Sequence, residues 1–153
     1  MTISHDVLVF QLDGKPCALK ITDIQEIIHI EPITPIPRAP SYVAGIINFR
    51  GNLLTVLDPA ERLFKDNKIT DRNQAYILIP VVESWPVGLV VSQVEEIVSS
   101  ENLELMDTPT ATQSLVNVNE QYCEGIVKWN TDETEKSAIL LDLKPLVKPV
   151  VDN

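Results

Sequence analysis

The sequence predicts a mainly β protein with short helices, folded as two small barrels that pack together along a groove. Three observations favour this fold class. Valine and isoleucine are concentrated in short apolar runs of the kind that form strands. Eleven prolines leave little room for long helices. The same order of strands and turns occurs twice, and about five strands in each copy fit a closed barrel, because closure removes exposed sheet edges.

The first copy begins with a hairpin. Residues 7–12 (VLVFQL) form one strand, Asp13-Gly14 is a typical two-residue turn, and residues 17–21 return as the partner strand. The isoleucines of residues 24–28 (IQEII) have helical spacing, which favours a helical turn, although a strand that continues the sheet fits almost as well. Prolines crowd residues 30–40 and predict a loop or an edge segment there.

The best-defined element is a hairpin followed by a short helix, in residues 42–64 (YVAGIINFRGNLLTVLDPAERLF). Two segments with alternating apolar residues flank the letters NFRG, in which Gly51 permits the positive φ that a two-residue turn requires. Asp58 suits the N-cap of the helix, because its carboxylate accepts a free backbone N–H. Pro59 suits the first helical position, where its missing N–H costs nothing. We therefore expect strand, turn, strand and a helix over residues 60–64.

The second copy repeats these elements in the same order. The aligned segments are residues 88–98 with 18–28, residues 123–129 with the first strand of the 42–64 hairpin, and residues 138–146 with its second strand and helix. Asp142 takes the position of Asp58 and is expected to cap a helix as well. Residues 99–119 are the longest irregular stretch.

The domain organisation follows from this repeat. We expect one domain over residues 1–153, made of two repeated halves at about residues 5–70 and 71–150. The polar residues 65–73 are the natural link between the halves.

Charge and composition exclude several function classes. The formal net charge of −10 argues against nonspecific nucleic-acid binding and against docking on an anionic membrane, both of which need clustered lysine and arginine. We recognise no signal peptide, and no apolar run reaches the roughly 20 residues of a membrane span. Cys17 and Cys123 are not spaced as a metal or redox pair, so we interpret both as buried thiols of a cytoplasmic protein.

The sequence offers few candidates for catalysis or metal binding. His5 and His29 have no neighbouring ligands at metal spacing, no serine lies in a nucleophile elbow, and no glycine-rich loop suits phosphate. Asp58 and Asp142 could form an acid–base pair, but their place at the two strand–helix junctions favours the capping role. We therefore expect no catalytic residue, no cofactor and no metal ion, and a protein that is not an enzyme.

Arg50 is the strongest candidate for a contact residue. It lies at the tip of the most regular hairpin of an acidic chain. Its position alone leaves open an exposed turn residue without a role, a contact to a partner, and an ion pair with Glu26. The planar guanidinium suits bidentate bonds to a carboxylate in the last two cases.

Several of these segments resemble the CheW family of chemotaxis coupling proteins. The matching pieces are IQEI (24–27), PRAPSYVAGIINFRG (37–51), LTVLD (54–58), GLVV (88–91), Gly125 and LLDL (140–143). The resemblance extends from residue 5 to residue 148, and residues 37–51 are its specific part. It implies two intertwined SH3-like five-stranded β-barrel subdomains.

The resemblance also implies a function. Members of the family are non-enzymatic adaptors that couple methyl-accepting chemoreceptors to a CheA-type histidine kinase in chemotaxis signalling. They bind the regulatory domain of the kinase at a barrel end, and they bind the cytoplasmic tip of the receptors in the groove between subdomains. For this chain the resemblance predicts a cytoplasmic protein without a cofactor, monomeric outside arrays and held at membrane receptor arrays through its partners.

Carried over position by position, the resemblance assigns partner binding to a set of apolar, charged and glycine residues. They are Ile24, Glu26, Ile28, Gly45, Arg50, Gly51, Gly88, Val94 and Ile97. The apolar members would anchor a helix in a groove, Arg50 would orient it, and the glycines would shape the hairpin.

Three positions depart from the family pattern, and they leave the receptor and the pathway open. Phe49 stands where leucine is common, Ser92 where aspartate is frequent, and Pro59 where leucine is usual. An adaptor of a non-flagellar, pilus-type chemosensory pathway is therefore an alternative. Two others are a small β-barrel enzyme or ligand-binding domain that uses Asp58 or Asp142, and a regulatory fragment that competes with an active coupling protein for the same kinase.

Overall fold

The computed structural model describes residues 4–64, 76–82, 86–107 and 118–148, and most of this part of the chain is strand. The first-half strands are β1 (Val7–Leu12), β2 (Lys15–Lys20), β3 (Ile24–His29), β4 (Val43–Phe49) and β5 (Asn52–Leu57). The later strands are β6 (Tyr76–Pro80), β7 (Val87–Val91), β8 (Gln93–Val98), β9 (Glu104–Asp107), β10 (Cys123–Thr131) and β11 (Thr134–Leu141). Two short α-helices, α1 (Pro59–Leu63) and α3 (Leu143–Val147), follow β5 and β11.

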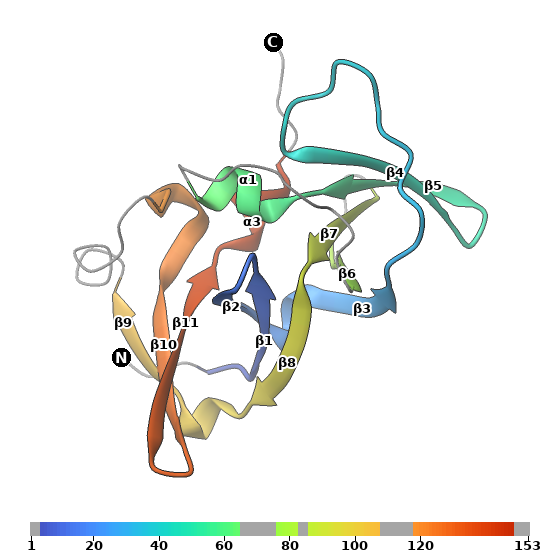
Figure 1. Cartoon of the computed structure of the whole chain (residues 1–153). Coiled ribbons are helices and arrows are strands. Elements are labelled where there is room, and N and C mark those ends of the chain that lie inside the picture. The colour runs from blue at the N-terminus through green and yellow to red at the C-terminus, as the bar shows by residue number, and fades with distance from the viewer. Residues whose placement is uncertain (1–3, 65–75, 83–85, 108–117, 149–153) are drawn as a thin grey trace.

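The strands form two sheets that exchange hairpins (Figure 1). The six-stranded sheet has the order β8-β1-β2-β11-β10-β9, and the five-stranded sheet has the order β3-β6-β7-β5-β4. The β1–β2 hairpin of the first copy therefore lies between strands of the second copy, and the β6–β7 hairpin of the second copy lies between strands of the first. Each exchange creates a parallel pair of strands, β2 with β11 and β5 with β7.

This exchange explains how the two subdomains are intertwined. The predicted fold class, mainly β with two SH3-like subdomains, is confirmed, with a sixth strand, β9, at the edge of one sheet. The predicted boundary near residue 70 does not separate the sheets, because each sheet takes strands from both sides of it. As a boundary between repeats it stays a prediction, and the predicted link over residues 65–73 lies outside the described residues.

Each copy has a β-bulge at a glycine, Gly45 in the first and Gly125 in the second. The register of β4 against β5 shifts between Val43 and Gly45, and that of β10 against β11 shifts between Cys123 and Gly125. Each glycine has a φ of +150°, and a Cβ placed on it would lie 2.2 Å from a carbonyl oxygen of the neighbouring segment. Only glycine lets that segment approach, so these positions fix where a further segment joins each sheet.

Residues 24–28 and 94–98 are strands, which corrects the predicted helical turn and confirms the alternative. Alternate residues of β3 and β8 are exposed, as on a strand with one covered face. Pairing with β6 and β1 outweighs the helical spacing of the isoleucines. Part of the predicted irregular stretch 99–119 is also regular: it contains a 3-10 turn (Ser100–Asn102) and β9.

The caps of the two helices differ. The Asp58 Oδ1 accepts a hydrogen bond from the Ala60 N–H at 3.1 Å, with Pro59 at the first position, which confirms the predicted cap. Asp142 occupies the N-cap position of α3 but makes no side-chain capping bond, so that prediction is wrong. The helix predicted over residues 60–64 begins and ends one residue earlier.

The core has one shared part and one smaller part within each sheet. Both faces of β1 are covered: Leu8, Phe10 and Leu12 join the shared cluster, whereas Val7 and Val9 join the cluster of the six-stranded sheet. Residues of both sheets and both helices contribute to the shared cluster. The subdomains are therefore joined by a continuous apolar core, which fixes the surfaces that they present.

Candidate functional site

The turn between β4 and β5 holds its two central residues in a left-handed conformation. Arg50 has a φ of 53° and Gly51 a φ of 83°, which is the geometry that a two-residue hairpin turn requires. The Asn48 Oδ1 accepts a hydrogen bond from the Gly51 N–H at 3.0 Å and closes the turn. Arg50 therefore projects from a rigid tip.

Arg50 forms a bidentate ion pair with Glu26 on the edge strand β3. The Arg50 Nη1 donates to Glu26 Oε1 at 2.9 Å and the Nη2 to Oε2 at 2.5 Å. The guanidinium also lies 4.5 Å from the centre of the Phe49 ring. The ion pair that the sequence left open is thus present. Because the Arg50 side chain is 65% exposed, the pair contributes little to stability, and its main effect is to hold the guanidinium in one orientation.

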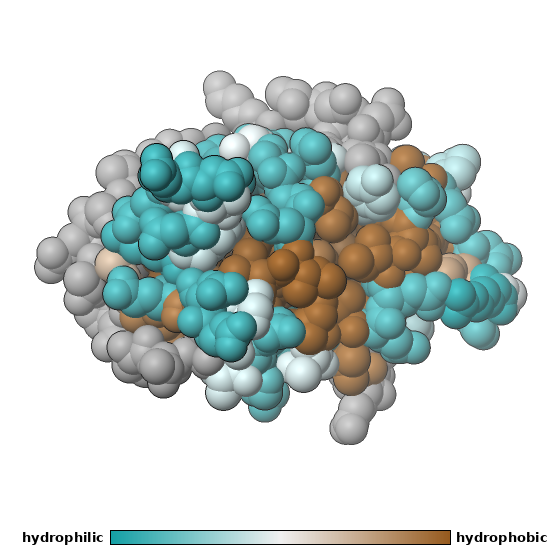
Figure 2. Space-filling model, turned by 90° about the horizontal axis from the view of Figure 1, so that it is seen from below, coloured by the Kyte–Doolittle hydropathy of each residue, from teal (hydrophilic) through white to brown (hydrophobic). Residues whose placement is uncertain are grey.

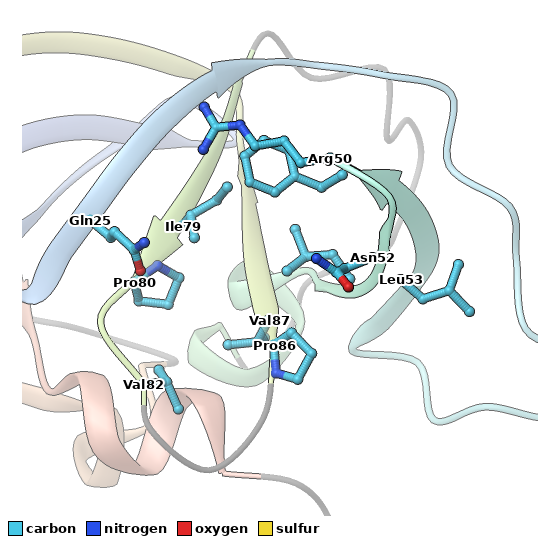
Figure 3. Close-up of a pocket in the computed structure, with 11 residues that line it drawn as sticks. Gln25, Arg50, Asn52, Leu53, Ile79, Pro80, Val82, Pro86 and Val87 are labelled. Carbon is cyan, nitrogen blue, oxygen red and sulfur yellow. The ribbon is translucent and has the colours of Figure 1, made fainter.

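A groove lies next to this ion pair, and we call it the first groove (Figure 3). Its volume is about 620 Å³. It is lined by residues of β3, of the β4–β5 hairpin, of the end of β6, of the start of β7 and of the connection between β6 and β7: Gln25, Phe49, Arg50, Asn52, Leu53, Leu54, Ile79, Pro80, Val82, Pro86 and Val87. Leu53, at the rim, is 64% exposed, so it is available for contact with a partner.

The edge strands β3 and β8 add exposed apolar side chains. Ile27 on β3 is 39% exposed, and Ile97, at the aligned position on β8, is 60% exposed. Figure 2 shows an apolar patch between hydrophilic regions on the face of the molecule seen from below. A patch of this kind, rimmed by polar residues, is typical of a protein-binding surface.

The structure brings only some of the predicted contact residues together. Arg50 lines the first groove, Glu26 is paired with it, and Gly51 follows it in the β4–β5 turn. Ile24 and Ile28 lie on β3 but are half-buried against the core. Val94 and Ile97 lie on β8, in the other sheet.

Gly45 and Gly88 are buried in strands, and both are better explained by packing. A Cβ on Gly88 would lie 2.7 Å from the Ile77 Cγ2, and one on Gly45 would meet a backbone carbonyl. Leu53, Gln25 and Val82 line the first groove but were not among the predicted contact residues. The one available signal was an apolar residue close to a turn, since Leu53 is the second residue after Gly51.

The two cysteines are buried, and their thiols are expected to be unreactive. Burial raises the pKa of the Cys17 thiol far above its usual range, with a smaller contribution from Cys123. Burial raises the pKa of Cys123 to about 11, with a smaller contribution from Glu120. Both side chains are therefore protonated thiols at neutral pH, which is unfavourable for nucleophilic or metal chemistry.

The described residues offer neither a metal site nor a membrane-spanning helix. They contain no group of three or more histidine, cysteine, aspartate or glutamate side chains arranged to hold a metal ion. None of the described helices is long and apolar enough to cross a membrane.

Comparisons with known proteins agree on one family. The family described as "CheW-like domain" matches residues 6–150. A chemotaxis protein CheW of Rhizobium meliloti is 33% identical over 106 residues, which cover 69% of this chain and 67% of the relative. That of Bacillus subtilis is 28% identical over 123 residues, which cover 80% and 76%. The crystal structure of the scaffolding protein TtCheW from Thermoanaerobacter tengcongensis superimposes with a TM-score of 0.72 at 27% identity, covering 97% of this chain and 95% of that one.

Proposed function

The chain belongs to the CheW-like family and is a chemotaxis scaffolding protein that couples chemoreceptors to a histidine kinase; from this premise we propose which of its surfaces bind each partner. The family is a non-enzymatic scaffold, so the surfaces to explain are binding surfaces. The chain would act in the cytoplasm, as a monomer outside arrays, and reach the membrane only through its partners.

The kinase would bind at the first groove. This groove opens at the end of the five-stranded sheet, and the regulatory domain of a CheA-type kinase is expected to dock at a barrel end. The exposed Leu53 supplies an apolar anchor, and Asn52 and Gln25 supply polar groups at the rim. An apolar anchor within a polar rim is the usual anatomy of a specific interface.

The receptor would bind on the outward faces of the edge strands. The cytoplasmic tip of a methyl-accepting receptor is helical, and a helix needs an apolar stripe with a polar group that fixes its direction. Ile27 and Ile97 are the exposed apolar side chains of β3 and β8. The Arg50–Glu26 pair links the β4–β5 turn to β3, and Arg50 lines the first groove, so the pair is placed to affect both partners.

The observation that carries this assignment is the oriented Arg50, held by Glu26 but 65% exposed. Replacing Arg50 by Asp places two carboxylates next to each other and removes the oriented cation. We expect the variant to fold, because its positive φ suits aspartate, and to bind receptor-containing membranes at least tenfold more weakly. The measurement is co-sedimentation with membranes that carry the receptors and the kinase.

The matched control is Arg38→Asp, which changes the charge equally at another exposed position with positive φ. If Arg50→Asp co-sediments like the wild type while its circular dichroism is unchanged, Arg50 has no role in coupling. If the control loses binding to the same extent, net charge and not Arg50 governs the interaction.

A further inference from the structure

The shared core reaches the surface beside the two edge strands β3 and β8. Residues that lie directly opposite each other on antiparallel strands point to the same face of the sheet. Ile27 lies opposite Leu78, and Ile97 lies opposite Leu8. Both leucines are buried in the shared cluster, whereas Ile27 is 39% exposed and Ile97 is 60% exposed. The two isoleucines proposed as receptor anchors therefore lie at the exposed border of one continuous apolar core.

His29 continues this border along β3. It is two residues after Ile27, so its side chain points to the same side of the strand, and it lies opposite Tyr76 of β6. The centres of the two rings are 5.2 Å apart and their planes are tilted by 35°, which is within the range of favourable ring pairs. Tyr76 is half-buried and packs against the shared cluster, whereas His29 is exposed. The imidazole is therefore held next to a receptor anchor by a side chain that is itself fixed in the core.

The second copy has no such ring pair at the aligned position on β8. Ser99 takes the position of His29, and Asp6, which precedes β1, takes that of Tyr76. The Asp6 Oδ1 accepts a hydrogen bond from the Ser100 N–H at 2.9 Å, and the Ser99 side chain makes no capping bond. The border of the core thus carries an isoleucine in both copies, but an aromatic pair beside only one of them.

The spacing and chemistry of Ile27 and His29 suit neighbouring side chains of one helix. Two residues of a strand are about 6.6 Å apart, close to the roughly 5–6 Å between helical residues three or four positions apart. An imidazole both donates and accepts hydrogen bonds, and within the described part of the chain no side chain forms an ion pair or hydrogen bond with that of His29. Because the ring already rests on Tyr76, little freedom is lost when a partner binds it.

We propose that His29 is a specificity-determining contact of the receptor surface. Its imidazole hydrogen-bonds a polar side chain of the receptor helix, and an apolar neighbour of that side chain packs on Ile27. Tyr76 is the positioning residue of His29. Because the aromatic pair occurs on the β3 side alone, it makes the two sides of the receptor surface unequal and fixes the direction of the bound helix. This inference rests on the proposed assignment of the receptor to β3 and β8.

Nuclear magnetic resonance tests the contact on the full-length chain. The chain contains two histidines, so a His5→Gln variant identifies the imidazole C–H signals of His29. The probe is a soluble fragment of the cytoplasmic hairpin tip of a methyl-accepting receptor from the same source. We expect this fragment to shift the His29 signals in a saturable way. The regulatory domain of the kinase, which is proposed to bind the first groove, should leave them in place.

A double-mutant cycle separates a contact from a merely structural role. His29→Ser gives β3 the residue of β8 and should bind receptor-containing membranes about three- to tenfold more weakly, as expected for the loss of one hydrogen bond. Tyr76→Leu keeps an apolar side chain against the core, removes the ring and should lose part of the same affinity. Because Tyr76 acts through His29, the double variant should bind no more weakly than His29→Ser. Ser99→Ala is the matched control and should bind like the wild type.

Ile27→Asp distinguishes a failure of this proposal from a failure of the receptor assignment. All variants are checked by circular dichroism for an unchanged fold. If Ile27→Asp binds the membranes weakly but His29→Ser binds like the wild type, or the fragment leaves the His29 signals in place, the proposal is overturned and the receptor assignment stands. If Ile27→Asp also binds like the wild type, both are overturned. Equal losses in Ser99→Ala and His29→Ser would overturn the proposed difference between the two sides.

Discussion

The hairpins β4–β5 and β10–β11 share two backbone features but present different side chains. Both carry a bulge at a glycine with a φ of +150° and a two-residue turn with positive φ, Arg50-Gly51 in one and Asp132-Glu133 in the other. The aligned glutamates of the edge strands each form an ion pair with a basic side chain. Glu26 pairs with Arg50, and Glu96 pairs with Lys136.

The two hairpins differ in the side chains that they expose and bury. The first hairpin exposes Leu53 beside Phe49 and Arg50, whereas the second buries Trp129 and has Ser137 at the position of Leu53. The two hairpins thus share the bulge and the turn conformation, and they differ in a few side chains next to them.

We expect the largest loss of stability from replacing the glycine at the β-bulge that both hairpins share. A Cβ on Gly45 or Gly125 would lie 2.2 Å from a carbonyl oxygen, so Gly45→Ala and Gly125→Ala should each cost about 3 kcal/mol of unfolding free energy. This corresponds to a fall in Tm of roughly 6–12 °C, measurable by calorimetry. Gly14→Ala is the control, because Gly14 also has positive φ but nothing within 4 Å of a new Cβ. If Gly14→Ala costs as much as the other two, the close approach is not the cause.

The second-largest expected effect concerns Arg62, a residue of α1 that has no charged counterpart in α3. Arg62 of α1 is 8% exposed, and its Nη1 donates to the carbonyl oxygens of Pro145 and Leu146, both at 2.9 Å. Its guanidinium also lies 3.8 Å from the centre of the Tyr42 ring. The aligned position in α3 is Leu146, so one cation joins both helices.

Arg62→Met keeps the length of the side chain but leaves these carbonyls without their donor. We expect a loss of about 2 kcal/mol in a denaturant titration. Hydrogen exchange should become faster in residues 143–148 than in the rest of the described chain. Arg38→Met, at an exposed position, should leave both quantities unchanged. Unchanged exchange at α3 in Arg62→Met would show that the apolar core alone holds this helix.

The smallest expected effect concerns pH. Cys123 aligns with Val43, and burial raises its pKa from 9.0 to about 11. The folded state therefore retains a proton that the unfolded state loses, so the contribution of Cys123 to stability is constant below pH 9 and is lost as the pH rises from 9 towards 11. Cys123→Val gives the second copy the residue of the first and should reduce the loss of Tm between pH 8 and pH 10, measured against the wild type. An equal loss in both proteins would mean that Cys123 ionises equally in the folded and unfolded states.

The sequence predicted the features that depend on local rules. The β1–β2 turn at Asp13-Gly14, the hairpin at Gly51 and the Asp58 cap each follow from the conformational preference of one or two residues. The two halves could also be aligned from the sequence, because residues with the same chemistry recur in the same order.

Other features depend on tertiary contacts and could not be predicted from local conformational preferences. The helical spacing of residues 24–28 was misleading, because strand pairing with β6 outweighed local preference. Exchange of the two hairpins leaves no local signal. The first groove is defined by side chains from several distant strands, so the sequence indicated Arg50 but not the depression beside it.

Calorimetric titration of the chain with the regulatory domain of a CheA-type kinase from the same source tests the central claim most directly. We predict complex formation at micromolar concentration or tighter. We also predict about tenfold weaker binding by Leu53→Ser, because losing one buried apolar anchor costs about 1–2 kcal/mol. The matched control is Ser137→Ala at the aligned position, which should bind like the wild type. Absence of binding by the wild-type chain, or equal binding by Leu53→Ser, would contradict the assignment of the first groove to the kinase.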